Sequence, residues 1–259
     1  MMTAAETSGL GPHAQAVLAS LLAGLATGLG GLLVILLPRL SRRVYDALLG
    51  FSGGVMLSAA ALTLLWPALE RGGIGSVTIG LFLGGLAVLA LERKVPHLEP
   101  HFAPWLNSGN GPGIRLAVLL ASAITLHNLP EGLAVGVAFA PGAGEFGVIV
   151  ALAIALQNIP EGLAVATPLR AHGCSPVRAV AWATLSGLAE PLAAAAGFHF
   201  VSSARLLVPF ALAFAAGAMV FVVSDQLIPE SHREPSDKAP SLALLAGFLL
   251  VAVLLRTFS

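Results

Sequence analysis

Eight long apolar runs limit the folds that this sequence can adopt. Between charged or Pro- and Gly-rich breaks, they cover roughly residues 14–37, 46–69, 74–91, 115–139, 146–168, 177–200, 205–229 and 240–257. A transmembrane helix needs about 20 mostly apolar residues, so each run is long enough to cross a bilayer. We therefore expect an all-α integral membrane protein with eight transmembrane helices, forming a single domain over residues 1–259. The first run follows no basic segment and precedes no convincing cleavage site, which predicts a retained helix and not a signal peptide.

Composition supports the membrane assignment and excludes several classes of protein. Apolar residues make up 57 % of the chain and charged residues 10 %, against about 25 % charged residues in soluble domains. The net charge is zero and no basic tail is present, so nothing predicts a nucleic acid partner. The single cysteine, Cys174, excludes an internal disulfide and a thiolate-rich metal site.

The distribution of basic residues predicts the orientation. Four alternate connections carry ten of the 13 lysines and arginines, at Arg39, Arg42, Arg43, Arg93, Lys94, Arg115, Arg170, Arg178, Arg233 and Lys238. Because cytoplasmic connections are enriched in basic residues, these four are expected in the cytoplasm. The protein is then expected in the bacterial inner membrane, with both termini on the periplasmic or extracellular side.

The longest connection, at about residues 92–114, has the composition of a flexible cytoplasmic loop. It contains His97 and His101 together with Glu92 and Glu99. The two histidines either bind a metal ion loosely beside the carboxylates or are simply solvated, and the sequence favours neither reading.

Two of the apolar runs contain a near-repeat of polar residues. The segments Ala123–Val135 and Ala153–Val165 lie 30 residues apart and agree at 10 of 13 positions. Each places a histidine or glutamine, an asparagine, a proline and a glutamate within five residues. Because such groups cost several kcal/mol in a bilayer, the pattern predicts a functional polar site.

Helical spacing brings the polar groups of each repeat together. Positions i and i+4 share a helix face, so His127 points with Glu131, and Gln157 with Glu161. Each repeat also has a proline, Pro130 or Pro160, which cannot donate its backbone hydrogen bond and predicts a kink. Imidazole nitrogen with carboxylate and amide oxygen suits a borderline divalent transition metal.

A purely structural role explains only some of these residues. Asparagine and glutamine often join membrane helices by hydrogen bonds, which accounts for Asn128, Asn158 and Gln157. Buried glutamates without a buried basic partner are not explained in this way. Further acidic residues, Glu190, Asp225 and Glu230, lie in later runs, and together these carboxylates predict cation binding. A methionine in an apolar helix usually fills the core, and composition alone favours this reading for Met56.

The doubled motif resembles the signature of the ZIP (ZRT/IRT-like) metal transporters, in their bacterial GufA-like and Bordetella-type branch. The resemblance rests on HNLPEG at 127–132 and QNIPEG at 157–162 and covers essentially the whole chain. It implies a 3+2+3 arrangement in which spans one to three are related to spans six to eight by inverted symmetry. It also implies two metal positions that share Glu131 and Glu161. The first would add Met56, His127 and Gln157, and the second Asn128, Asn158 and Glu190. Many relatives have histidine where this chain has Gln157, which implies weaker selectivity for zinc.

The function expected from this sequence is import of divalent transition metals into the cytoplasm. Zn²⁺ is the first candidate, followed by Fe²⁺, Mn²⁺ and Cd²⁺, with Asp225, Glu230, His97 and His101 as candidate pathway residues. The expected partners are divalent metal ions and the lipid bilayer, with a homodimer left open and no cofactor. An intramembrane metal-dependent hydrolase is disfavoured because the chain lacks a His-Glu-x-x-His motif. A metal-sensing membrane protein without flux is the other alternative.

Overall fold

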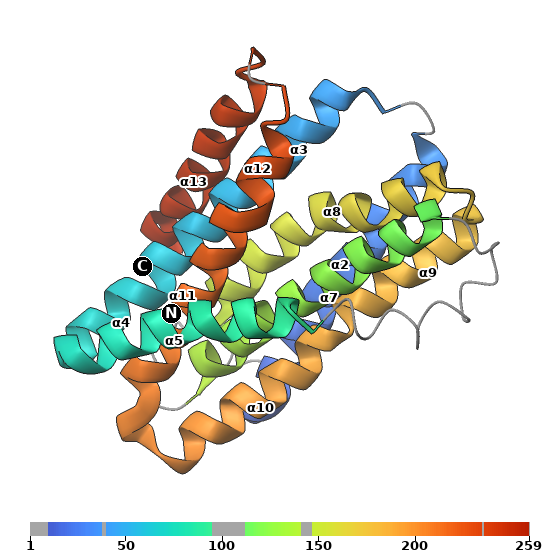
Figure 1. Cartoon of the computed structure of the whole chain (residues 1–259). Coiled ribbons are helices and arrows are strands. Elements are labelled where there is room, and N and C mark those ends of the chain that lie inside the picture. The colour runs from blue at the N-terminus through green and yellow to red at the C-terminus, as the bar shows by residue number, and fades with distance from the viewer. Residues whose placement is uncertain (1–9, 38–39, 95–111, 141–146, 235, 259) are drawn as a thin grey trace.

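The computed structural model describes residues 10–37, 40–94, 112–140, 147–234 and 236–258, and every regular element in these ranges is a helix. Figure 1 shows the bundle that these helices form. The longer helices are α2 (Pro12–Leu36), α3 (Arg42–Ser58), α5 (Ile74–Glu92), α7 (Pro112–Phe139), α8 (Gly147–Ala171), α9 (Pro176–Gly187), α10 (Ala189–Ser203), α11 (Val208–Val222) and α13 (Ala239–Phe258). The shorter ones are η1 (Ala59–Leu65), α4 (Trp66–Arg71), η3 (Arg205–Leu207), η4 (Val223–Leu227) and α12 (Ile228–Ser231).

The eight expected spans are confirmed, with boundaries that differ by a few residues. Among the described side chains, seven helical stretches are long and apolar enough to cross a membrane. The eighth is α7, a helix of 28 residues. Several spans combine elements: the second joins α3, η1 and α4, the sixth joins α9 and α10, and the seventh runs from η3 to α12.

Two of these spans contain a π-helical segment in place of regular α-helix. Ala59–Leu65 lies in the second span and Val223–Leu227 in the seventh. Such insertions shift the phase of a helix face and are frequent at functional sites. Hydropathy does not reveal them, because it measures how apolar a run is and not the pitch of its helix.

The packing of the helices has the expected inverted symmetry. The helix α2 packs closely on α8, and its counterpart α10 packs on α7. In the same way α3 packs on α13, and its counterpart α11 packs on α5, as Figure 1 shows for α3 and α13. Exchanging spans one to three with six to eight, and four with five, therefore maps each close pair onto another. The two π-helical segments also exchange, which supports the 3+2+3 arrangement.

Glycines without side-chain bulk allow the two motif helices to approach their neighbours. A β carbon at Gly162 of α8 would overlap the backbone carbonyl of Thr27 on α2. A β carbon at Gly132 of α7 would overlap the carbonyl of Glu190 on α10. Because both glycines belong to the repeated motif, the motif places each site helix directly against a helix of the flanking half.

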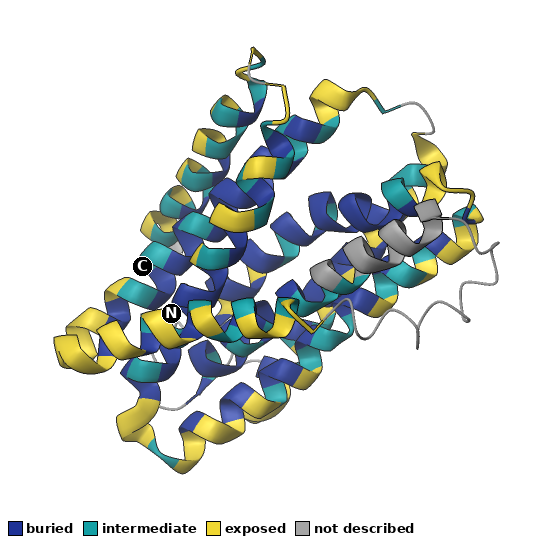
Figure 2. Ribbon diagram, viewed as in Figure 1, coloured by how far each residue is buried: buried dark blue, intermediate teal, exposed yellow. Residues whose placement is uncertain are grey.

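Burial places α8 at the centre of the bundle. In its most apolar stretch 72 % of the residues are buried, against 17 % for α13. Figure 2 shows buried residues along α8 and exposed residues on the outer faces of α5, α10 and α13. The polar residues on α8 are thus shielded by protein, while the outer helices present apolar side chains to lipid.

Candidate metal site

The residues expected to bind metal are all buried in the bundle. Each is at most 3 % exposed, and they come from α3, α7, α8 and α10: Met56, His127, Asn128, Glu131, Gln157, Asn158, Glu161 and Glu190. These helices belong to the second, fourth, fifth and sixth spans. The fold therefore buries polar groups from distant parts of the chain.

The first group of contacts joins α7, α8 and α3. The Gln157 amide Nε2 donates a hydrogen bond to Glu131 Oε1. The Ser52 hydroxyl on α3 donates to Glu161 Oε1 at 3.1 Å and to the Gln157 carbonyl at 3.3 Å. The glutamates of the two motifs are therefore held by uncharged donors from other helices.

The second group joins α8, α10 and α2. The Asn158 amide Nδ2 donates to Glu190 Oε1 at 2.6 Å and to the Ala23 carbonyl at 2.7 Å. One amide thus connects a motif helix with helices of both flanking halves. Glu190, which lies 29 residues after the second motif glutamate in the sequence, is placed beside that motif by the fold.

The three buried glutamates share one pattern of hydrogen bonding. In Glu131, Glu161 and Glu190 the Oε1 atom accepts a hydrogen bond, as described above. Among the described residues, Oε2 of each has no hydrogen-bond partner. The same holds for buried polar atoms of four further side chains: His127 Nε2, Asn128 Nδ2 and Oδ1, Gln157 Oε1 and Asn158 Oδ1. Buried polar atoms are normally paired. All of these atoms except the Asn128 amide nitrogen, which is a donor, can offer a lone pair, so their concentration is well suited to a cation.

Carboxylates and imidazoles alone do not make a complete coordination shell here. Within the described ranges, no three histidine, cysteine, aspartate or glutamate side chains form a group that could hold a metal ion. The ligand sets implied by the family resemblance therefore depend on the amides of Gln157, Asn128 and Asn158 and on the Met56 thioether. Amide oxygens are harder and weaker ligands than imidazole for zinc.

A cavity leads from one end of the bundle to His127. Its volume is about 700 Å³, and its lining includes His127, His172, Asp225 and Glu230. Asp225 and Glu230, two of the four expected pathway residues, thus line the same cavity as the motif histidine. The other two, His97 and His101, lie outside the described residues.

Glu92, which the sequence placed in the loop beside His97 and His101, lies instead at the end of α5 and is a neighbour of the buried site. Its Oε1 atom lies 3.8 Å from His127 Nε2 and accepts a hydrogen bond from the Gln226 amide. Glu92 is the last residue of α5, at the end of an apolar run. The sequence does not show that α5 ends beside α7, so it could not connect Glu92 with His127.

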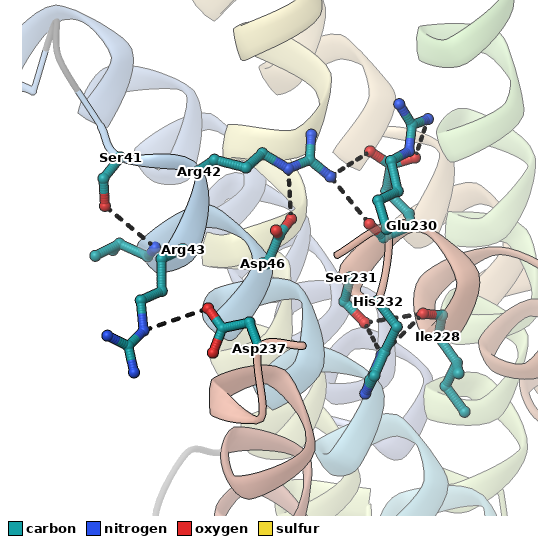
Figure 3. Close-up of polar contacts among 11 residues, drawn as sticks. Ser41, Arg42, Arg43, Asp46, Ile228, Glu230, Ser231, His232 and Asp237 are labelled. Carbon is teal, nitrogen blue, oxygen red and sulfur yellow. Dashed lines mark hydrogen bonds and ion pairs between the residues drawn. The ribbon is translucent and has the colours of Figure 1, made fainter. Parts of the chain in front are cut away.

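At the mouth of the cavity, arginines neutralise the carboxylates. The Arg42 Nε atom lies 2.8 Å from Asp46 Oδ1, and its Nη2 atom lies 3.2 Å from Glu230 Oε1. Arg233 pairs with the other oxygen of Glu230. Figure 3 shows Arg42 between Asp46 and Glu230, where it connects the start of α3 with α12. Asp225, in contrast, is exposed on η4.

The sequence is similar to one protein family and to several named proteins. The sequence model of the family described as "ZIP Zinc transporter" matches residues 107–255. A protein named zinc transporter GufA, from Myxococcus xanthus, is 42 % identical over 92 % of this chain and 96 % of its own length. Zinc transporter ZIPB from Bordetella bronchiseptica is 42 % identical over 88 % of this chain and 76 % of its own. Human zinc transporter ZIP11 is 34 % identical, covering 92 % and 95 %.

Proposed function

The chain belongs to the ZIP zinc transporter family, and on this basis we propose that it imports divalent transition metals into the cytoplasm through a midplane site on α7 and α8. Membership makes it a multi-pass membrane transporter of divalent metal and not an enzyme. The proposal adds the direction of transport, the ligands and the order of preference, with Zn²⁺ ahead of Fe²⁺, Mn²⁺ and Cd²⁺.

The observation that carries the proposal is the unpaired second oxygen of three buried glutamates. Oε2 of Glu131, Glu161 and Glu190 lacks a hydrogen-bond partner among the described residues. A buried carboxylate without a countercharge is costly, and a divalent cation would offset that cost. His127, Gln157 and Met56 would complete one metal position, and Asn128, Asn158 and Glu190 the other. When both are filled, Glu131 and Glu161 bridge two ions.

The cavity supports a route between this site and one side of the membrane. It extends from His127 past Asp225 to the arginine-paired Glu230. The basic residues Arg42 and Arg233 at its mouth belong to connections that the charge bias places in the cytoplasm. Metal leaving the site would therefore enter the cytoplasm. The sequence has no Gly-x-x-x-x-Gly-Lys motif for ATP binding, so gradients or coupled ions would drive transport.

Metal uptake into proteoliposomes tests this function. The protein should accumulate Zn²⁺, and Glu131→Ala or Glu161→Ala should each lower the initial rate at least about tenfold, a change of roughly 1.4 kcal/mol or more. Expression and gel-filtration behaviour should stay intact, because the carboxylates bind cargo and do not hold the fold together. Glu70→Ala serves as the matched control, since Glu70 is exposed and its Oε1 accepts a hydrogen bond from the Trp66 indole, away from the buried site.

Two results would contradict the proposal. Full uptake by both folded glutamate variants would remove these residues from the metal site. Saturable zinc binding without any uptake by the native protein would instead support the metal-sensing alternative.

A further inference from the structure

Two histidines from distant parts of the sequence meet at the end of the bundle opposite the cavity. His13 lies in the first turn of α2, and His199 lies near the end of α10. Their ring centroids are 5.0 Å apart and the ring planes are inclined by 47°. The cavity mouth is formed by the start of α3 and the end of α8. The span before α3 is α2, and His13 lies at its far end. The span after α8 is formed by α9 and α10, and His199 lies near its far end.

The separation of the rings matches the geometry of a shared metal ion. A tetrahedral zinc ion bonds imidazole nitrogen at about 2.0–2.1 Å, which places two ring centres about 5 Å apart. Inclined rings, unlike parallel stacked ones, allow a nitrogen of each to converge on one point. Among the described residues, neither imidazole ring makes a hydrogen bond that would have to break before the rings could turn toward a shared ion.

Neighbouring residues hold the pair in place and leave it accessible. Phe198 packs its ring edge against His13, with centroids 5.2 Å apart, and is itself buried. Both histidines are exposed, so a metal ion and its remaining water ligands can reach them. The contact with Phe198 accounts for the position of the His13 ring. It does not account for the second imidazole, His199, beside that ring.

We propose that His13 and His199 form a second binding site for divalent transition metals, separate from the buried site. Two imidazoles with water as the remaining ligands select borderline ions such as Zn²⁺, Co²⁺, Ni²⁺ and Cu²⁺ over Mg²⁺ and Ca²⁺. The site lies on the membrane side opposite the cavity mouth and concentrates metal there. It does not depend on the proposed transport function, since binding at this pair requires no flux.

Zinc protection of the two histidines from acylation tests the site directly. The full-length protein is treated with diethyl pyrocarbonate, and modification of each histidine is followed by mass spectrometry. With Zn²⁺ at about ten times its dissociation constant, acylation of both His13 and His199 should slow about tenfold. Mg²⁺ at the same concentration should not slow it.

Reciprocal variants distinguish a shared ion from two independent histidines. In His199→Ala the zinc protection of His13 should disappear, and in His13→Ala that of His199 should disappear. Phe200→Ala, an exposed neighbour of His199, should retain full protection of both. Protection of either histidine that survives loss of the other, or no zinc protection in the native protein, would overturn the proposal. Either result would leave the test of Glu131 and Glu161 unaffected.

Discussion

Individual side chains in the buried site combine carboxylates with uncharged donors. Gln157 donates to Glu131, Ser52 to Glu161, and Asn158 to Glu190. An amide or hydroxyl orients one carboxylate oxygen and leaves the negative charge for another partner. An arginine or lysine in these positions would neutralise the glutamate and compete with a cation. The choice of donors is therefore consistent with a site that binds metal reversibly.

Gln157→His should shift metal preference toward zinc. An imidazole at this position can bind metal through one nitrogen while the other donates to Glu131, as the amide does now. Because imidazole is a softer and stronger ligand than an amide oxygen, the ratio of Zn²⁺ to Mn²⁺ uptake should rise about tenfold, or roughly 1.4 kcal/mol. The measurement is competitive uptake of both ions in the same vesicles. Gln157→Asn, which keeps an amide, should not raise the ratio. An unchanged ratio in a folded, active histidine variant would leave Gln157 as a packing residue.

Ser52→Ala should weaken metal binding without unfolding the protein. The hydroxyl bonds Glu161 and the Gln157 carbonyl across the contact between α3 and α8, so its removal frees the carboxylate to rotate. Hydrogen bonds to charged groups contribute about 1.5–3 kcal/mol, and part of this should appear as a several-fold higher dissociation constant for Zn²⁺. Calorimetric titration of the purified variant measures the change. Ser52→Thr keeps the hydroxyl and should restore the affinity, and equal affinities in all three proteins would show that Ser52 does not position Glu161.

The helices of the bundle approach one another most closely at glycines. On α3, a β carbon at Gly54 would overlap the Leu244 carbonyl of α13, whereas one at the adjacent Gly53 would meet side chains at 3.5 Å or more. The two neighbouring glycines therefore differ in how closely another backbone approaches. Hydropathy treats them as identical residues of one apolar run.

Gly54→Ala should destabilise the protein much more than Gly53→Ala. Overpacking a well-filled core costs about 1–3 kcal/mol, and at Gly54 the obstacle is backbone, which cannot rotate away. At Gly53 the extra methyl group makes ordinary contacts, and alanine favours the helix by about 1 kcal/mol. Thermal unfolding in detergent should show a clearly lower midpoint for Gly54→Ala only. Equal midpoints for the two variants would contradict the close packing of α3 on α13.

The bundle as a whole has two different ends. One end carries the cavity and its arginine-paired mouth, and the other carries His13 and His199. The inverted arrangement of its two halves coexists with side chains that are not symmetric. The two ends therefore present different side chains to the two sides of the membrane.

Maleimide labelling at the connection between α8 and α9 tests its packing and, through a second position, which end of the bundle faces the cytoplasm. The Cys174 side chain in this connection is buried, and burial raises the pKa of its thiol although Arg178 and Arg170 act in the opposite direction. Only the thiolate reacts with maleimide, so a raised pKa means slow labelling of the native protein at neutral pH and faster labelling as pH rises. Reaction at neutral pH as fast as that of a free thiol would contradict the buried position.

The exposed position His172 supplies the matched measurement. In a Cys174→Ala background, His172→Cys should label rapidly. With an impermeant maleimide it should react in inside-out vesicles and not in intact cells, if this end faces the cytoplasm. The opposite pattern would reverse the orientation predicted from the basic residues.

The sequence by itself was sufficient for the properties that depend on local chemistry. Apolar runs of sufficient length predicted the spans, and helical spacing predicted which residues of one motif share a face, as with Gln157 and Glu161. Charge density predicted a membrane protein, and the doubled motif identified the family. The predicted ends differ from the observed ones by at most a few residues, because charges and prolines mark them.

The tertiary structure alone decided which of these helices are in contact and which residues along their length face one another. It brought Ser52 to Glu161, Glu92 to His127, and His13 to His199, pairs separated by 109, 35 and 186 residues in the chain. The physical reason is that helix periodicity is a property of neighbouring residues, whereas contacts between helices depend on where two backbones can approach. That approach is set by glycines such as Gly162 against Thr27 and by the phase shift of the π-helical segments, and neither changes the hydropathy from which the spans are read.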